Sequence, residues 1–202
     1  MKNNLRKSFL FSRLTLIIAI NTFLCACIAH PIVISPQETP KRNGTTLSPK
    51  KVAYVMTDAD RNKQVTTEGG AGDKVSYFPY RDLEKPIRDV LRSLYSDVFV
   101  IKSPSDSDAI QGNGISFIFA PEISTSSNSA SMFTWPPTQF SIELFCSVTD
   151  PVGNMISRIR VAGNGSAEFS EFKTDFGLAG RRAATDVSEK FKQEIKTNKR
   201  LR

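Results

Sequence analysis

Two cysteines, Cys25 and Cys27, stand two positions apart at the end of an apolar run, and the only histidine of the chain, His30, follows them closely. Thiol and imidazole groups serve as nucleophiles, bases and metal ligands, so this segment is the first place to look for chemistry. Beyond it the chain has one further cysteine, Cys146, and no further histidine. A folded domain built from the rest lacks the groups for a Ser-His-Asp, Cys-His or ordinary zinc site, and we expect no enzyme, no metal and no cofactor.

The first 26 residues have the pattern of a signal peptide. They carry four basic residues and no acidic one, and an eleven-residue apolar stretch occupies positions 14–24. A membrane-spanning helix needs about 20 apolar residues, which makes an uncleaved membrane anchor the less favoured alternative.

The apolar stretch ends in Leu24, Cys25, Ala26 and Cys27, which resembles the lipobox of bacterial lipoproteins. The resemblance implies that Cys27 is lipidated on its sulfur, becomes the first residue after cleavage and is acylated on its new amine. Several acyl chains hold a protein firmly at a bilayer, whereas one holds it only marginally. Cys25 is a poor acceptor because Leu24 stands where a small residue belongs. Ile28, in place of an aspartate, implies the outer membrane facing the periplasm, with the inner membrane as the alternative.

Charge does not indicate nucleic acid as a partner. The formal charge is +7, but removing the leader leaves 23 basic against 20 acidic residues. The remaining basic excess lies near the two ends, including a basic tail at 199–202, without aromatic residues interleaved for base stacking.

Residues 27–49 contain four prolines and an Asn-Gly pair, which is typical of a tether, and we expect His30 to be a linker residue. Residues 50–198 then form a single domain. Alternation, three- and four-residue spacing and turn residues predict these elements within it: a strand at 51–57, a polar loop with at most a short hairpin at 58–77, a helix within 81–98, strands at 97–102, 114–124, 139–149 and 155–169, and a helix within 176–195.

This β-α-β-β-β-α order predicts an α+β fold, a two-layer sandwich in which two helices cover one face of a mixed sheet of four to five strands. Asp82 is the predicted N-cap of the first helix, and Pro86 is placed in its first turn. In the second helix, small residues lie beside a row of apolar residues and predict close packing on the sheet. Cys146 alternates with apolar neighbours, so we expect it to be a small buried hydrophobe.

Three patterns resemble chemical motifs without completing them. Asp58, Asp60 and Asn62 begin like a calcium loop, but the glycine and glutamate that such a loop requires are not in register. Ser170 and Lys173 have S-x-x-K spacing without the accompanying motifs. The Gly-Gly-Ala-Gly run at 69–72 lacks the lysine of a phosphate loop, and a flexible loop is the better interpretation.

The segment 124–137 is a polar run that ends in an apolar tip. Met132, Phe133 and Trp135 are our candidate contact residues, and Trp135 is the best anchor among them. The equally favoured alternative is that these side chains fold back over the edge of the sheet.

In organisation, the chain resembles small Gram-negative envelope lipoproteins, among them the auxiliary lipoproteins of lipid-transport ABC systems, YajG-like lipoproteins and TolB amino-terminal-type domains. This resemblance implies a non-enzymatic adaptor or accessory subunit of a cell-envelope complex, held at the membrane by its lipid and bound to an envelope protein. The alternative is a periplasmic carrier or sensor of a small apolar ligand or lipid. A hydrolase that uses Ser170 is a third hypothesis.

Overall fold

The structure, a computed structural model, describes residues 29–36, 38, 48–130, 133–172 and 174–202. Its centre is a mixed five-stranded sheet in the order β5-β2-β6-β7-β8. These strands are β2 (Ser48–Val55), β5 (Tyr95–Ile101), β6 (Ile115–Asn128), β7 (Gln139–Thr149) and β8 (Met155–Ser166). Strand β2 runs parallel to β5 and β6, and β6, β7 and β8 are antiparallel neighbours. The predicted mixed sheet is confirmed.

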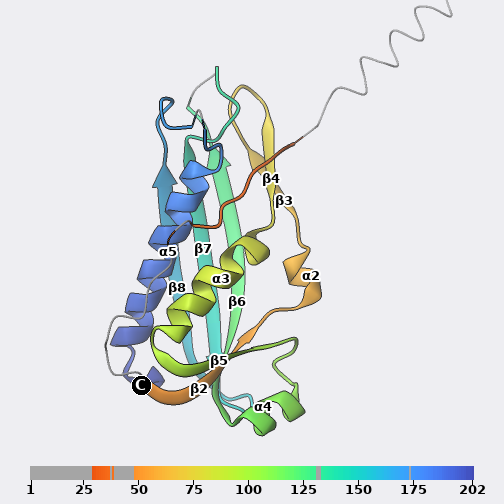
Figure 1. Cartoon of the computed structure of the whole chain (residues 1–202), viewed down its shortest axis with the longest axis vertical. Helices are drawn as coiled ribbons and strands as arrows, with labels where there is room; N and C mark the ends of the chain where they lie inside the picture. Colours follow the sequence, from red (N-terminus) through yellow and green to blue (C-terminus); the bar gives the residue numbers. More distant parts are fainter. Residues whose placement is uncertain (1–28, 37, 39–47, 131–132, 173) are drawn as a thin grey trace, which may run out of the picture.

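Helices α3 (Pro79–Arg92) and α5 (Leu178–Thr197) cover one face of this sheet (Figure 1). The predicted α+β class is confirmed. The side chains between the two layers are almost wholly buried, and the predicted apolar row of α5 is among them: Ala179, Ala183, Val187, Phe191 and Ile195. Cys146 is also buried in this core, as expected.

Glycines in β8 allow α5 to approach the sheet closely. A Cβ atom at Gly163 would lie 2.4 Å from the carbonyl oxygen of Ala183, and one at Gly165 would lie 2.1 Å from that of Ala179. No side chain fits in this space. Small residues on both the helix and the strand therefore set the distance between the layers.

The segment predicted as a polar loop at 58–77 contains helix α2 (Asp58–Arg61) and the short hairpin of β3 (Val65–Glu68) and β4 (Lys74–Tyr77). Strand β1 (His30–Pro31) adds to β4, giving a small sheet in the order β1-β4-β3. On the other side of the large sheet, α4 (Ser107–Asn113) closes a second, smaller core. The described helices include none that is long and apolar enough to cross a membrane.

The predicted tether does not extend over the whole of 27–49. Ile32 and Ile34 are buried in the main core. The Ile32 amide donates a hydrogen bond to the carbonyl oxygen of Ser76 (2.9 Å), and the Ile34 amide donates to Oδ2 of Asp82 (3.1 Å). Two alternating apolar residues among prolines are too short a pattern to predict a strand. The folded part therefore includes residues on the N-terminal side of position 50.

Two further expectations about the chain were wrong. Helix α3 begins at Pro79, so Asp82 is not its N-cap, and Pro86 lies inside the helix beyond the first turn. A proline at the first helical position fits that site without the loss of a hydrogen bond, and Pro79 takes it. The segment predicted as a basic tail contains a short 3₁₀ helix, η1 (Lys199–Leu201). Leu201 is buried in the main core, and its carbonyl oxygen accepts a hydrogen bond from Tyr95 (2.9 Å).

Candidate functional site

The loop between β6 and β7 brings Trp135 into an aromatic cluster at one end of the sheet, at the top in Figure 1. The rings of His30 and Trp135 are stacked with centroids 4.2 Å apart, and the ring of Phe176 lies 4.7 Å away from Trp135. Trp135 is therefore half-buried, and His30 is not a linker residue. We call this cluster, with the residues of the pocket beside it, the aromatic end.

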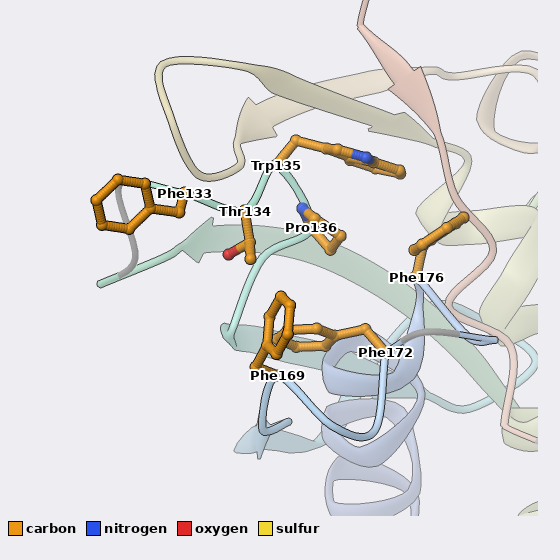
Figure 2. Close-up of a pocket in the computed structure, with 7 residues that line it drawn as sticks. All are labelled: Phe133, Thr134, Trp135, Pro136, Phe169, Phe172 and Phe176. Carbon is orange, nitrogen blue, oxygen red and sulfur yellow. The ribbon is translucent and has the colours of Figure 1, made fainter.

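An apolar pocket of about 220 Å³ opens at the aromatic end (Figure 2). Phe172 is 3% exposed, whereas Phe133, Phe169 and Phe176 are 96%, 64% and 46% exposed. The pocket thus combines one buried ring with three rings that face solvent. Its lining consists of Phe133, Thr134, Trp135, Pro136, Phe169, Phe172 and Phe176.

The two expectations for the apolar tip each describe a part of it. Phe133 projects away from the domain, as a contact residue would, while Trp135 packs back on the N-terminal segment (Figure 2). Met132, the third candidate contact, lies outside the described residues, as do all four lipobox residues: Leu24, Cys25, Ala26 and Cys27.

The glycine-rich turn between β3 and β4 supports the Trp135 loop. The Gly70 amide donates a hydrogen bond to the carbonyl oxygen of Trp135 (2.8 Å). A Cβ atom at Gly69 would lie 2.3 Å from that oxygen, and one at Gly70 would lie 1.7 Å from the carbonyl oxygen of Thr134. This run was expected to be a flexible loop, but it is a tight turn against which another loop packs.

The N-terminal segment that carries His30 is held by contacts with α3, with α5 and with the loop before α5. Arg181 donates a hydrogen bond to the carbonyl oxygen of Val33 (3.1 Å) and forms an ion pair with Asp175. Gly177 approaches the same carbonyl so closely that its Cβ would lie 2.2 Å away. Burial raises the pKa of Asp82, whose carboxylate accepts from the Ile34 amide. Residues 32–34 are therefore fixed by contacts from both helices.

Several acidic residues around the aromatic end lie beside basic side chains. Asp73 lies 3.6 Å from Nε2 of His30, and Lys74 lies 3.9 Å from Glu68. Arg182 binds Glu171 at 2.6 Å, and this hydrogen bond lowers the pKa of Glu171 to about 2. The chemical character of this surface is thus set by its phenylalanines and not by an excess of one charge.

Sequence reasoning missed His30, Phe169, Phe172 and Phe176 as members of the site. A signal for the phenylalanines was present, because three of them recur within the polar stretch 168–176. Nothing in the spacing of His30 indicated its position, since its partner Trp135 is far away in the chain.

The other candidate motifs have structural uses. The hydrogen bond from Lys102 (2.8 Å) lowers the pKa of Asp58, and Asp60 completes a capping box with Thr57 at the start of α2. Among the described residues, no three His, Cys, Asp or Glu side chains are grouped so that they could hold a metal ion. Burial raises the pKa of the Cys146 thiol, which keeps it in its unreactive form.

Ser170, the serine of the S-x-x-K pattern, is exposed in the loop that follows β8, and Lys173 lies outside the described residues. Among the described residues, no hydrogen bond joins the Ser170 hydroxyl to a side chain that could act as its base. Only the S-x-x-K spacing of Ser170 and Lys173 therefore supports the hydrolase hypothesis.

A second surface of interest is the face of β6, β7 and β8 that points away from α3 and α5. At its centre the Arg160 guanidinium lies 4.8 Å from the centroid of the Phe145 ring and donates to Oε1 of Glu143 (2.9 Å). Phe145 and Arg160 line a hollow of about 410 Å³ together with Glu122 and Arg158. Exposed aromatic and arginine side chains are the types enriched at protein interfaces.

No family model and no curated protein sequence matches the chain. Solved structures do resemble it. Protein XCC0632 from Xanthomonas campestris, of the family DUF330, has a TM-score of 0.50 and 14% identity over 81% of this chain and 93% of its own. A homolog of neuraminyllactose-binding hemagglutinin from Helicobacter pylori has a TM-score of 0.51 and 11% identity over 85% of this chain and 94% of its own. At these identities the likeness concerns the fold alone.

Proposed function

We propose that the chain is a periplasm-facing lipoprotein, anchored at Cys27, that acts as a non-enzymatic adaptor or accessory subunit of a cell-envelope complex. The outer membrane is its proposed location, with the inner membrane as the alternative. The observation that carries the proposal is the path of the N-terminal segment. His30, three residues after Cys27 in the sequence, is held at the aromatic end by its pairing with Val75 and its stacking on Trp135. A lipid at Cys27 would therefore leave the sheet face that carries Phe145 and Arg160 open to a protein partner.

The anchor is tested by palmitate labelling of cells that express the full chain. Labelling is expected to disappear in Cys27→Ser. It should persist in Cys25→Ser, a matched control, because serine is a small residue that suits this lipobox position. Labelling that survives Cys27→Ser would contradict the lipid anchor.

The adaptor role is tested by photo-crosslinking in living cells from a probe at Phe145, at the centre of the open sheet face. A probe at Glu189, exposed on the solvent side of α5, is the matched control. We expect a discrete protein adduct from position 145 and none from position 189. A third probe at Phe133 reports on the aromatic end, and no protein adduct from positions 145 and 133 would contradict the adaptor role.

The carrier is the second candidate, because the aromatic pocket contains an unsatisfied polar group. Thr134 lines the pocket, is 8% exposed, and its Oγ1 is buried without a hydrogen-bond partner in the described part of the chain. A small apolar ligand with one polar group would satisfy it. At about 220 Å³ the pocket is below the roughly 300 Å³ at which ligand sites begin, so it suits a short chain or a single ring.

The carrier hypothesis predicts that a medium-chain alcohol changes the fluorescence of Trp135 in a saturable way. Thr134→Val keeps the shape of the side chain and removes the hydroxyl, and it should weaken the binding. Fluorescence that does not respond to the alcohol would contradict this second function.

A further inference from the structure

We propose that the aromatic end contacts the surface of the lipid bilayer in which the chain is anchored, so that the domain stands on the membrane by this end. The inference rests on the proposed lipid anchor at Cys27. It adds an orientation and a contact surface that the anchor alone does not provide.

The chain between Cys27 and His30 is short. Cys27 precedes His30 by three residues, and an extended chain spans at most about 3.6 Å per residue, so the lipidated residue lies within about 11 Å of His30. His30 itself is fixed, because it pairs with Val75 in β4 and stacks on Trp135. The lipid therefore cannot be far from the aromatic end.

The exposed surface at the aromatic end is rich in apolar rings. Phe133, Phe169 and Phe176 expose their rings at this end, and Val33, which is also exposed, lies beside Gly177. Phenylalanine and tryptophan side chains are typical of surfaces that bind at the boundary between headgroups and acyl chains. Phe145 on the open sheet face is also exposed, at 38%, but the aromatic end brings three exposed phenylalanine rings together.

Acidic side chains at the rim of the aromatic end lie beside basic ones. Glu68, Asp175 and Glu171 each form an ion pair with a lysine or arginine, and Asp73 lies beside His30. Paired charges provide no net attraction to anionic headgroups and no strong repulsion from them. We therefore expect contact through apolar side chains, independent of the charge of the lipid.

The experiment uses the fact that Trp135 is the only tryptophan of the chain. The mature lipidated protein is reconstituted into phosphatidylcholine vesicles with brominated or ordinary acyl chains, and its fluorescence is compared. We expect a marked loss of Trp135 fluorescence in the brominated vesicles. The loss should be the same when part of the phosphatidylcholine is replaced by phosphatidylglycerol.

The matched control moves the reporter to the other end of the molecule. The double variant Trp135→Phe, Val152→Trp places the only tryptophan in the β7–β8 turn, at a position that is 82% exposed in the wild type. It should float with the vesicles and show no loss. In Phe133→Ser, which removes the most exposed ring without touching the core, the loss at Trp135 should decrease.

Each outcome is decisive. Protein that floats with the vesicles while Trp135 keeps its fluorescence would overturn the contact and leave the anchor intact. Equal loss at positions 135 and 152 would overturn the orientation. Protein that fails to float would contradict the proposed anchor instead. A protein adduct from the Phe133 probe in cells would show that a protein, and not the bilayer, occupies the aromatic end.

Discussion

Phenylalanine occurs in two contrasting environments in this molecule, the helix–sheet core and the aromatic end. In the core, Phe119, Phe140 and Phe191 are no more than 1% exposed and pack between strands and helices. At the aromatic end, Phe133 and Phe169 are mostly exposed to solvent. Burial of the first group stabilises the fold, whereas the second group exposes apolar surface that can still be buried when something binds. The contrast separates residues that hold the fold from residues that can make contacts.

The largest expected effect is on stability, and it tests this separation directly. Phe191→Ala should lower the free energy of unfolding by about 3–5 kcal/mol, because it leaves a cavity against Phe119. Phe133→Ala should change it by no more than about 0.5 kcal/mol, because Phe133 is 96% exposed and its removal takes little buried surface from the fold. Urea denaturation of both variants provides the measurement. Comparable losses would mean that the aromatic end is part of the folding core.

The next effect concerns how the aromatic end is held in place. Gly70→Ala should destabilise the protein by about 1–3 kcal/mol, since the new methyl group would overlap the carbonyl oxygen of Thr134. The fluorescence of Trp135 should change with it. Gly112→Ala is the control: no atom lies near the new methyl group, and alanine in helix α4 should stabilise by up to about 1 kcal/mol. Unchanged stability in Gly70→Ala would mean that the turn does not support the loop.

A smaller, pH-dependent effect is expected from Asp82, which holds the N-terminal segment. Burial raises the pKa of Asp82 in the folded protein, so its charged form is disfavoured by folding and its contribution to stability falls as pH rises through that raised pKa. Each unit of such a shift corresponds to about 1.4 kcal/mol. Asp82→Asn keeps an acceptor for the Ile34 amide and carries no charge.

The free energy of unfolding of Asp82→Asn should therefore increase relative to that of the wild type as pH rises from roughly 3 to roughly 8. The two values should be most similar at the acidic end of this range. Denaturant titrations at a series of pH values measure the difference. A difference that shrinks with rising pH would mean that the charged carboxylate is stabilised by its surroundings.

The smallest effect is expected at Cys146, which shares the core with the buried phenylalanines. Burial raises the pKa of its thiol, so a maleimide should label the folded mature protein very slowly. In urea the same thiol should react readily, as a mass shift of one adduct would show. Equal rates in the two conditions would mean that the core opens easily.

Local patterns were enough to predict the main layers. Alternation placed Cys146 and its neighbours on a buried face, and the four-residue row of α5 was buried as expected. These periodicities are properties of a single strand or helix, so they can be read without knowing what packs against them. The start of α3 was the exception, because Pro79 and Asp82 both suit a first turn, and the buried contact of Asp82 with Ile34 is not local.

The candidate site was only partly predictable. From residue order alone it follows that an apolar tip with Trp135 comes after β6 and that three phenylalanines recur after β8. That these side chains meet, that the glycine turn at 69–72 supports them and that His30 packs with them follows from the folded arrangement of the chain. These contacts join four segments that are far apart in the chain, and contacts of this kind produce no periodic pattern in the sequence of any one segment.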